Sequence, residues 1–328
     1  MKRIGIGLLI LVGSWQLSLG QDKKSTIQPY LAYQGFFDNR EFFQLGLQPS
    51  TYFGQRISPG FTTQLDSTNK LIVSINFLQE FGNPRLISSW QPEVFFQHTT
   101  KKIQFVFGAF PREKWADTLA LAIFSDSLRY TRPNATGFSL KNKRKTGHSS
   151  LWLDWSGQKT ALLREQFFIG TAHQGKWKGF AWQVEGGLTH IAKSSQPAPE
   201  QFIEEQVAWL MQLGKDFHQK ENLFQFRLGW LQSWERIRNG TAIQSPTSLW
   251  ILGGYQYKRW EVQHTRKHGQ SHRLAMGDPF YQFENYHRTD LRYTWGQRGK
   301  WKVEGIYSLH CANQVWSHQQ RLLIRFDW

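Results

Sequence analysis

Apolar and polar residues alternate along almost the whole chain, in segments of about ten residues. The C-terminal segment shows the pattern best, because Leu322, Ile324 and Phe326 fall on one face of an extended strand. Arg321 and Arg325 fall on the opposite face. About ten residues is also the length that crosses a bilayer as a tilted β-strand. The pattern therefore predicts strands, each with one apolar and one polar face.

The breaks in the alternation divide the chain into sixteen predicted strands. They are residues 27–35, 51–65, 70–80, 87–98, 102–110, 137–143, 148–155, 161–173, 177–191, 203–215, 223–234, 248–257, 259–268, 285–296, 301–312 and 318–328. Tight connections alternate with mostly longer ones, as in a barrel with short periplasmic turns and longer extracellular loops. We predict an all-β protein, a transmembrane antiparallel meander β-barrel of about sixteen strands with both termini on the periplasmic side.

A soluble β-sandwich would also alternate, so the composition of the two faces matters. The apolar faces carry aromatic residues near their ends, as expected where a barrel meets the lipid–water boundary. These residues are Trp177, Trp250, Trp260, Trp295, Trp301 and Trp328. The opposite faces are charged, which suits a water-filled lumen. Both features favour the membrane barrel.

The first twenty residues have the features of a secretory signal peptide. Lys2 and Arg3 precede an apolar run from Ile4 to Leu17, and small residues follow up to Gly20. We therefore predict a signal peptide at residues 1–20 and a single barrel domain at residues 21–328. The alternative is an N-terminal membrane anchor, but the apolar run is short for a spanning helix.

Composition and charge exclude several other classes of protein. The chain has 40 Lys and Arg against 24 Asp and Glu, with 16% aromatic residues. Its one cysteine, Cys311, rules out a scaffold of internal disulfides. No second apolar stretch is long enough for a spanning helix. The charges alternate along strands instead of forming a basic patch, which argues against nucleic-acid binding.

The chain resembles bacterial outer-membrane β-barrels at its C-terminus, where Phe326 and the aromatic terminal residue Trp328 look like an assembly signal. The segments at residues 151–159 and 164–167 are similar to porin-like outer-membrane proteins of Bacteroidota. The resemblance implies a bacterial outer-membrane location. It also implies outer-membrane lipid, lipopolysaccharide and the barrel-assembly machinery as partners, and it transfers no functional residue.

A barrel of sixteen strands has a lumen that its own side chains cannot fill. The sequence therefore predicts a pore for small hydrophilic solutes, anionic or sugar-like, because the predicted inward faces are rich in arginine. The predicted lumen residues are Arg164, Arg227, Arg288, Arg292, Lys302, Arg321 and Arg325. Two alternatives stay open: these charges form ladders with acidic neighbours, or the positive charge faces lipopolysaccharide.

Residues 111–136 form the longest predicted loop and supply a candidate constriction. Trp115, Leu119 and Ile123 recur at every fourth position, which predicts a helix with one apolar face. So apolar a segment would be poorly placed in water, and we expect it to fold into the lumen. The alternative is an extracellular helix that caps neighbouring loops.

No catalytic residue, cofactor or metal site is predicted, and the protein is not expected to be an enzyme. Ser308 and His310 share a predicted inward face, which is a weak indication of a hydrolase. His264, His268 and His272 have a spacing that suits a metal on a helix, but they fall on a strand and a loop, which favours exposed histidines. A structural or ligand-binding barrel without an open channel, and a homo-oligomer, remain open.

Overall fold

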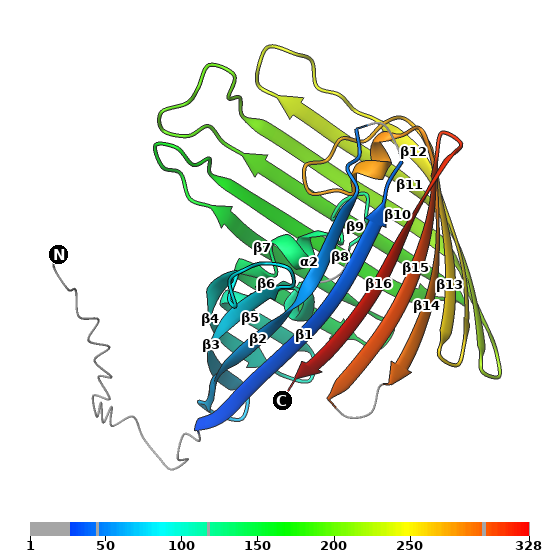
Figure 1. Ribbon diagram of the computed structural model, residues 1–328. Coiled ribbons are helices and arrows are strands. Elements are labelled where there is room, and N and C mark those ends of the chain that lie inside the picture. The colour runs from blue at the N-terminus through cyan, green and yellow to red at the C-terminus, as the bar shows by residue number, and fades with distance from the viewer. Residues whose placement is uncertain (1–26, 44–45, 117–118, 297–299, 328) are drawn as a thin grey trace.

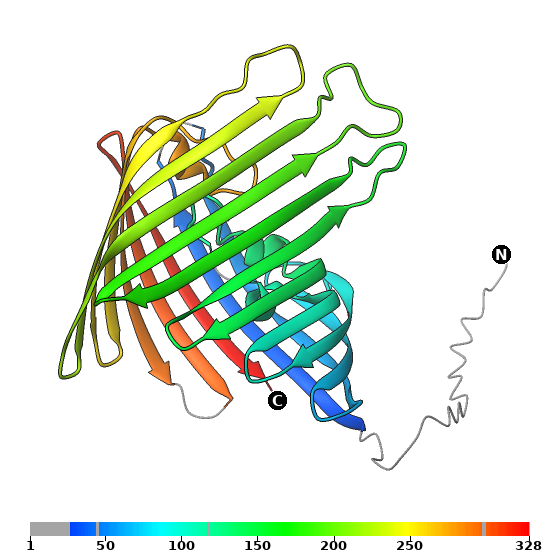
Figure 2. The same cartoon turned by 180° about the vertical axis from the view of Figure 1, so that it is seen from behind.

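The computed structural model of the chain describes residues 27–43, 46–116, 119–296 and 300–327. Within these ranges, sixteen strands form one closed antiparallel barrel in which each strand pairs with its neighbours in the sequence (Figures 1 and 2). β1 closes the barrel by pairing with β16. The predicted meander barrel is confirmed, whereas the predicted signal peptide and Trp328 lie outside the described residues.

The strand bounds agree with the predicted ones to within a few residues at most ends. The strands are β1 Ile27–Glu41, β2 Ser50–Gln64, β3 Asn69–Glu80, β4 Ser89–Thr99, β5 Ile103–Pro111, β6 Asn134–Arg144, β7 Gly147–Gly157, β8 Gln166–Trp177, β9 Phe180–Ile191, β10 Glu204–Gln219, β11 Asn222–Ile237, β12 Thr247–Tyr257, β13 Trp260–Gly269, β14 Asn285–Gly296, β15 Trp301–Ala312 and β16 Val315–Asp327. β1 is longer than predicted because residues 36–41 continue its pairing with β16. In the described residues, no helix has the length and apolar character needed to span a membrane.

The two faces of the wall follow the predicted alternation. Leu322 is 39% exposed on the outside, whereas Leu323 is 1% exposed on the inside. Trp260 and Trp301 lie on the outward face, as predicted. Trp250 does not: it is 3% exposed and stacks on Tyr281 within the lumen, with ring centroids 5.5 Å apart. It occupies the inward position of β12 and belongs to the lumen core.

The connections make the two rims of the barrel different. β1 begins and β16 ends at one rim, where the tight turns gather (Figure 1). Several of these turns contain a residue with positive φ, such as Lys178, Lys220 and Lys258, which matches the turn geometry of two-residue β-hairpins. We call this the short-turn rim. The opposite long-loop rim carries most of the longer connections.

The longest connection lies between β5 and β6, and its described residues 112–116 and 119–133 fold into the barrel, as Figures 1 and 2 both show. Leu119 and Ile123 are each 2% exposed and belong to a core cluster that includes residues of β7, β8, β10, β11 and β12. Gly187 on β9 makes room for Ile123, because a Cβ there would lie 2.5 Å from the Ile123 Cγ2 atom. The loop is therefore fitted to the wall.

The predicted continuous helix in this loop is wrong. The described part of the loop contains only two short helices, α1 Arg112–Trp115 and α2 Leu128–Thr131. Between them, backbone groups bond to distant partners: Ala120 N donates to Glu185 Oε2, and Ser125 N donates to the carbonyl of Met276. Contacts with the wall and with loop 270–284 thus replace the hydrogen bonds that a helix would make.

Candidate functional site

A buried charge cluster lies where the inserted loop meets the barrel wall. Asp126 of the loop accepts hydrogen bonds from Arg40 of β1 at 2.9 Å and from Arg321 of β16 at 2.5 Å. Arg288 of β14 lies 3.7 Å from the same carboxylate. Burial alone would raise the pKa of Asp126, but the three guanidinium groups outweigh it and hold the pKa well below its ordinary value. Asp126 thus stays ionised and ties the loop to three strands.

The other predicted lumen residues on strands are ion-paired as well. The pairs are Arg227 with Asp216, Arg292 with Glu261, Lys302 with Glu304, and Arg325 with both Glu304 and Glu113. Carboxylate partners cancel most of the positive field that these side chains would otherwise direct into the lumen. The contacts favour the charge-ladder alternative, and the anion preference stays a prediction.

Arg164 is the one predicted lumen residue that the structure places elsewhere. Its segment forms a turn, in which Leu163 N donates to Thr160 Oγ1, so β8 begins two residues later at Gln166. The Arg164 guanidinium pairs with Glu204 at 2.8 Å and donates to the carbonyl of Ala192 at 2.9 Å. Arg164 therefore joins two loops at the long-loop rim.

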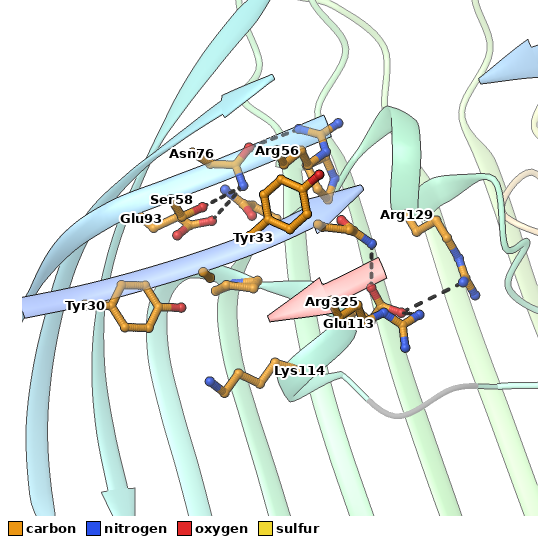
Figure 3. A pocket seen from close by; sticks show the side chains of 15 residues that line it. Tyr30, Tyr33, Arg56, Ser58, Asn76, Glu93, Glu113, Lys114, Arg129 and Arg325 are labelled. Carbon is orange, nitrogen blue, oxygen red and sulfur yellow. Dashed lines mark hydrogen bonds and ion pairs between the residues drawn. The ribbon is translucent and has the colours of Figure 1, made fainter. Parts of the chain in front are cut away.

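Two cavities lie within the barrel beside the inserted loop. One has a volume of about 230 Å³ and is lined by residues of β1 to β4 and of the loop (Figure 3). Figure 3 shows Glu113 between Arg325 and Arg129, with the second pair 3.8 Å apart. The other, of about 320 Å³, is lined by residues of β9, β10, β12 to β14 and β16 and shares Arg129 with the first. The lumen is narrowed but not filled.

Ser308 and His310 are not brought together. Ser308 donates to Asp290 and accepts from Arg321 at 2.9 Å, so its hydroxyl belongs to the charge cluster. His310 Nδ1 lies 2.7 Å from the Tyr286 hydroxyl, and its ring stacks on Phe280 with centroids 4.5 Å apart. No nucleophile and base meet here, and His310 packs within the core.

His272 forms a hydrogen-bonded relay that the sequence did not reveal. Its Nε2 lies 2.9 Å from Ser248 Oγ, its Nδ1 lies 2.8 Å from Ser233 Oγ, and Ser233 donates to Glu235 at 2.8 Å. His272 is 2% exposed, so the expectation of an exposed histidine is wrong. Burial, with a smaller effect of Lys267, lowers the pKa of His272 to about 3. The relay is sealed inside the barrel and anchors loop 270–284 to β11 and β12.

The other two histidines of that triplet lie on β13 and point outward. His268, which was predicted to enter a loop, donates to Asn285 Oδ1 of β14. His264 contacts Thr289 of the same neighbouring strand. The three histidines do not converge, and among the described residues no group of His, Cys, Asp and Glu side chains could hold a metal ion.

A patch of polar side chains interrupts the outward apolar face of β13 to β15. It consists of His264, Arg266, His287, Thr289 and Cys311, and we call it the lipid-facing polar patch. His264 and Arg266 have the same strand parity as the outward-facing Trp260 and Val262. His264 pairs across the sheet with Thr289, and Arg266, His287 and Cys311 form the next row toward the long-loop rim.

The depth of the patch follows from strand geometry. Trp260 begins β13 at the short-turn rim, and His264 comes four residues later. At a rise of about 3.3 Å per residue, these positions are about 13 Å apart along the strand. With a tilt of about 40°, this is about 10 Å along the barrel axis, and Arg266 lies farther on. His264 therefore lies near the middle of the wall, and the row of Arg266, His287 and Cys311 lies in the half nearer the long-loop rim.

The patch holds a hydroxyl and an imidazole in direct contact. Thr289 Oγ1 lies 2.9 Å from His264 Nδ1, and the His264 and His287 rings are 5.9 Å apart between centroids. Arg266 is close enough to act electrostatically on both imidazoles. Ionisable side chains that face lipid are costly and are usually retained for function. A nucleophile beside a base is the arrangement that acyl transfer requires.

Solved structures that resemble this fold include outer-membrane barrels. OmpT of Vibrio cholerae, in a trimer form, matches with a TM-score of 0.54 at 9% identity, covering 92% of this chain and 100% of its own. OccK8 (OprE) of Pseudomonas aeruginosa matches with a TM-score of 0.54 at 9% identity, covering 92% and 98%. These likenesses support the fold, and the protein is a bacterial outer-membrane barrel. The link to porin-like proteins of Bacteroidota stays a prediction.

No curated protein matches this chain in sequence. One protein family does: the pattern of the lipid A 3'-O-deacylase-type family matches residues 19–320. That family is named for an enzyme that removes an acyl group. The expectation from the sequence that this protein is not an enzyme is therefore wrong.

Proposed function

This chain belongs to the lipid A 3'-O-deacylase-type family, and from that membership we propose that it is an outer-membrane esterase acting on acylated glycolipids of the lipid A class. Such a substrate lies in the membrane outside the barrel, with its acyl chains against the lipid-facing wall. Long loops face the cell exterior in barrels of this kind. The row of Arg266, His287 and Cys311 then lies in the outer-leaflet half of the wall, and the Thr289–His264 pair lies just below it, near the middle of the wall.

The contact between Thr289 and His264 is the observation that carries the proposal. When Thr289 Oγ1 attacks the ester carbonyl, His264 Nδ1 accepts the hydroxyl proton and then returns it to the departing sugar oxygen. This leaves the acyl group on Thr289 as an ester. Water, deprotonated by His264, then releases the fatty acid and restores the Thr289 hydroxyl. The acid–base steps need only these two side chains and water.

A second threonine on the lipid-facing wall provides a natural comparison. Thr171 of β8 lies 2.9 Å from His173 Nε2, the same distance as in the proposed pair. However, Thr171 Oγ1 donates its proton to the carbonyl of Ser150 at 2.9 Å. That hydroxyl has no proton left for an imidazole, whereas the hydroxyl of Thr289 has no partner besides His264 within the described residues. The two contacts therefore differ in catalytic competence.

The experiment compares matched threonine variants in purified, folded protein. We expect Thr289→Val and His264→Gln to reduce release of fatty acid from lipid A by at least about a hundredfold, the usual range for loss of a base or nucleophile. Thr171→Val should retain the wild-type rate. Mass spectrometry of the lipid measures the loss of one acyl chain, and heat-modifiable gel mobility confirms that each barrel has folded.

A variant of the buried His272 relay provides the result that would exclude the Thr289–His264 pair as the catalytic site. If Ser248→Ala abolishes hydrolysis while Thr289→Val does not, catalysis takes place inside the barrel and the lipid-facing pair is excluded. If the wild-type protein leaves every acyl chain of lipid A in place, the proposed activity itself is wrong.

A solute pore is the second candidate, and the two lumen cavities favour it. They flank the inserted loop, share Arg129 and leave the lumen partly open. In this proposal Trp115, Leu119 and Ile123 form the constriction and the basic lumen residues contact anionic or sugar-like solutes. Planar-bilayer recordings test it: an anion-selective conductance supports the pore, and a silent barrel contradicts it.

A further inference from the structure

Arg266 differs from the arginines that line the lumen because it has no counter-charge. It is exposed on the outward face of β13, and within the described part of the chain its guanidinium has no hydrogen-bond or ion-pair partner. In the lumen, Arg288 and Arg321 are paired with Asp126 and Asp290. A cation on the lipid-facing wall is destabilising to a degree that increases with depth. An anion supplied by the membrane would remove this cost.

The surroundings of Arg266 form a polar pocket at the outer surface. The pocket has a volume of about 360 Å³ and is lined by Arg266, Asn285, His287, Cys311, Asn313 and Gln314. The side-chain oxygen of Asn285, Oδ1, accepts a hydrogen bond from His268. The side-chain nitrogen of Asn285 is therefore able to donate to a ligand. Asn313 and Gln314 both have positive φ and form the tight β15–β16 turn at the long-loop rim. The pocket thus offers a forked cation and neutral donors, with no carboxylate in its lining.

We propose that this pocket binds the phosphate group of an outer-leaflet glycolipid. The forked guanidinium of arginine matches phosphate oxygens, and charge-assisted hydrogen bonds of this kind are among the stronger polar contacts. Lining amides and an imidazole complete the recognition of a polar headgroup. The inference rests on the proposed function in taking this lipid to be the substrate.

The pocket and the Thr289–His264 pair have the spacing of a headgroup and its ester. Arg266 and His264 are two residues apart on β13, as are His287 and Thr289 on β14, which is about 7 Å along each strand. The pair lies on the side toward the short-turn rim, deeper in the membrane. A lipid with its phosphate on Arg266 would place a neighbouring ester near Thr289 and its acyl chain along the apolar wall below.

A pair of outward arginines beside Glu205 does not fit this role. Arg236 and Arg238 near the long-loop rim lie 3.9 Å and 2.5 Å from the carboxylate of Glu205. Glu205 also lies 3.8 Å from His190. This carboxylate already neutralises the cluster, and it would repel a phosphate. Arg238 is therefore a suitable control, being an exposed arginine whose charge is satisfied within the protein.

Lipid binding is tested first, in Thr289→Val protein, which we expect not to hydrolyse the lipid. Thr289→Val protein, alone and combined with Arg266→Gln or Arg238→Gln, is mixed with equal amounts of lipid A and phosphatase-treated lipid A, and native mass spectrometry counts the bound lipid. We expect Thr289→Val to prefer the phosphorylated lipid by tenfold or more. Adding Arg266→Gln should abolish the preference, Arg266→Lys should restore it in part, and Arg238→Gln should leave it intact. An unchanged preference in Arg266→Gln overturns the proposal.

Two further measurements show whether the pocket binds lipid phosphate or free phosphate, and whether it acts in substrate binding or in catalysis. Inorganic phosphate at 10 mM should not displace the lipid; displacement would show a site for free phosphate and overturn the lipid assignment. In active protein, Arg266→Gln should raise KM for lipid A about tenfold with a smaller effect on kcat. Two results together would uphold the pocket and reject the proposed catalytic pair. They are a loss of phosphate preference when Arg266→Gln is added, and full hydrolytic activity of Thr289→Val alone.

Discussion

Asp126 is the residue on which the inserted loop most depends. Its carboxylate is 3% exposed and lies within ion-pair distance of Arg40, Arg288 and Arg321. Removing one partner of a buried ion pair leaves the other charge without compensation, which costs about 3–5 kcal/mol. We expect Asp126→Asn to lower the free energy of unfolding by about that amount, measured by urea titration of intrinsic tryptophan fluorescence in detergent.

An exposed pair provides the control for this prediction. Glu221 and Lys258 lie 3.6 Å apart with more than half of each side chain exposed. Solvent screens surface pairs of this kind, so they contribute little to stability. Glu221→Gln should therefore leave the unfolding midpoint almost unchanged. An equal effect of the two variants would mean that the Asp126 cluster is not the buried network described above.

Among single residues, the sequence predicted side-chain direction within a strand but not contacts between distant strands and loops. The inward position of Arg321 followed from alternation, because side-chain direction in a strand has a period of two residues. Its partner Asp126 is 195 positions away and could not be found by the same argument. The pairing of His264 with Thr289 also escaped prediction, since the register across a long connecting loop is not written in the local pattern.

At the scale of elements, loop 270–284 is held by an imidazole that must remain neutral. His272 contacts Ser233 and Ser248, and burial lowers its pKa to about 3 against an ordinary value near 6.5. The detached loop binds more protons than the attached loop below pH 6.5, so attachment is fully favourable above that pH and weakens as the pH falls toward 3. Because detachment is coupled to uptake of one proton, the equilibrium constant for attachment falls about tenfold per pH unit between these two pH values.

A fluorophore reports this detachment. Ala275 is exposed on the same loop, and Ala275→Cys in a Cys311→Ser background gives one labelling site. We expect the label to become mobile between pH 6 and pH 3, and Ser248→Ala to shift the change to higher pH. In His272→Gln the dependence should disappear. A label whose mobility follows pH equally in His272→Gln would exclude the histidine as the cause.

The inserted loop shows where element prediction from sequence reaches its limit. Trp115, Leu119 and Ile123 indicated an apolar segment, and the structure buries all three within the barrel. The same spacing suggested a helix, but Ala120 bonds to Glu185 of β9 and the loop follows the shape of the wall instead. Strands were predicted well because their pattern is local; the loop's path depends on surfaces formed by distant strands.

At the scale of the whole molecule, the orientation of the barrel decides whether the proposed esterase can meet its substrate. The Arg266, His287 and Cys311 row of the lipid-facing polar patch lies toward the long-loop rim, so it reaches the outer leaflet only if that rim faces the cell exterior. Outer-membrane barrels place their short turns in the periplasm. The alternation of short and long connections along the sequence already predicts one rim of tight turns and one rim of longer loops.

Epitope tags test the orientation directly. Leu162, in the connection between β7 and β8, is 85% exposed at the long-loop rim, so a tag inserted there should be stained on intact cells. A tag between Lys145 and Thr146, in the turn between β6 and β7, should be stained only after permeabilisation. Heat-modifiable mobility confirms that both insertions leave the barrel folded. The reverse staining would place the patch in the inner leaflet, away from any outer-leaflet glycolipid, and would remove the basis for both the catalytic pair and the phosphate pocket.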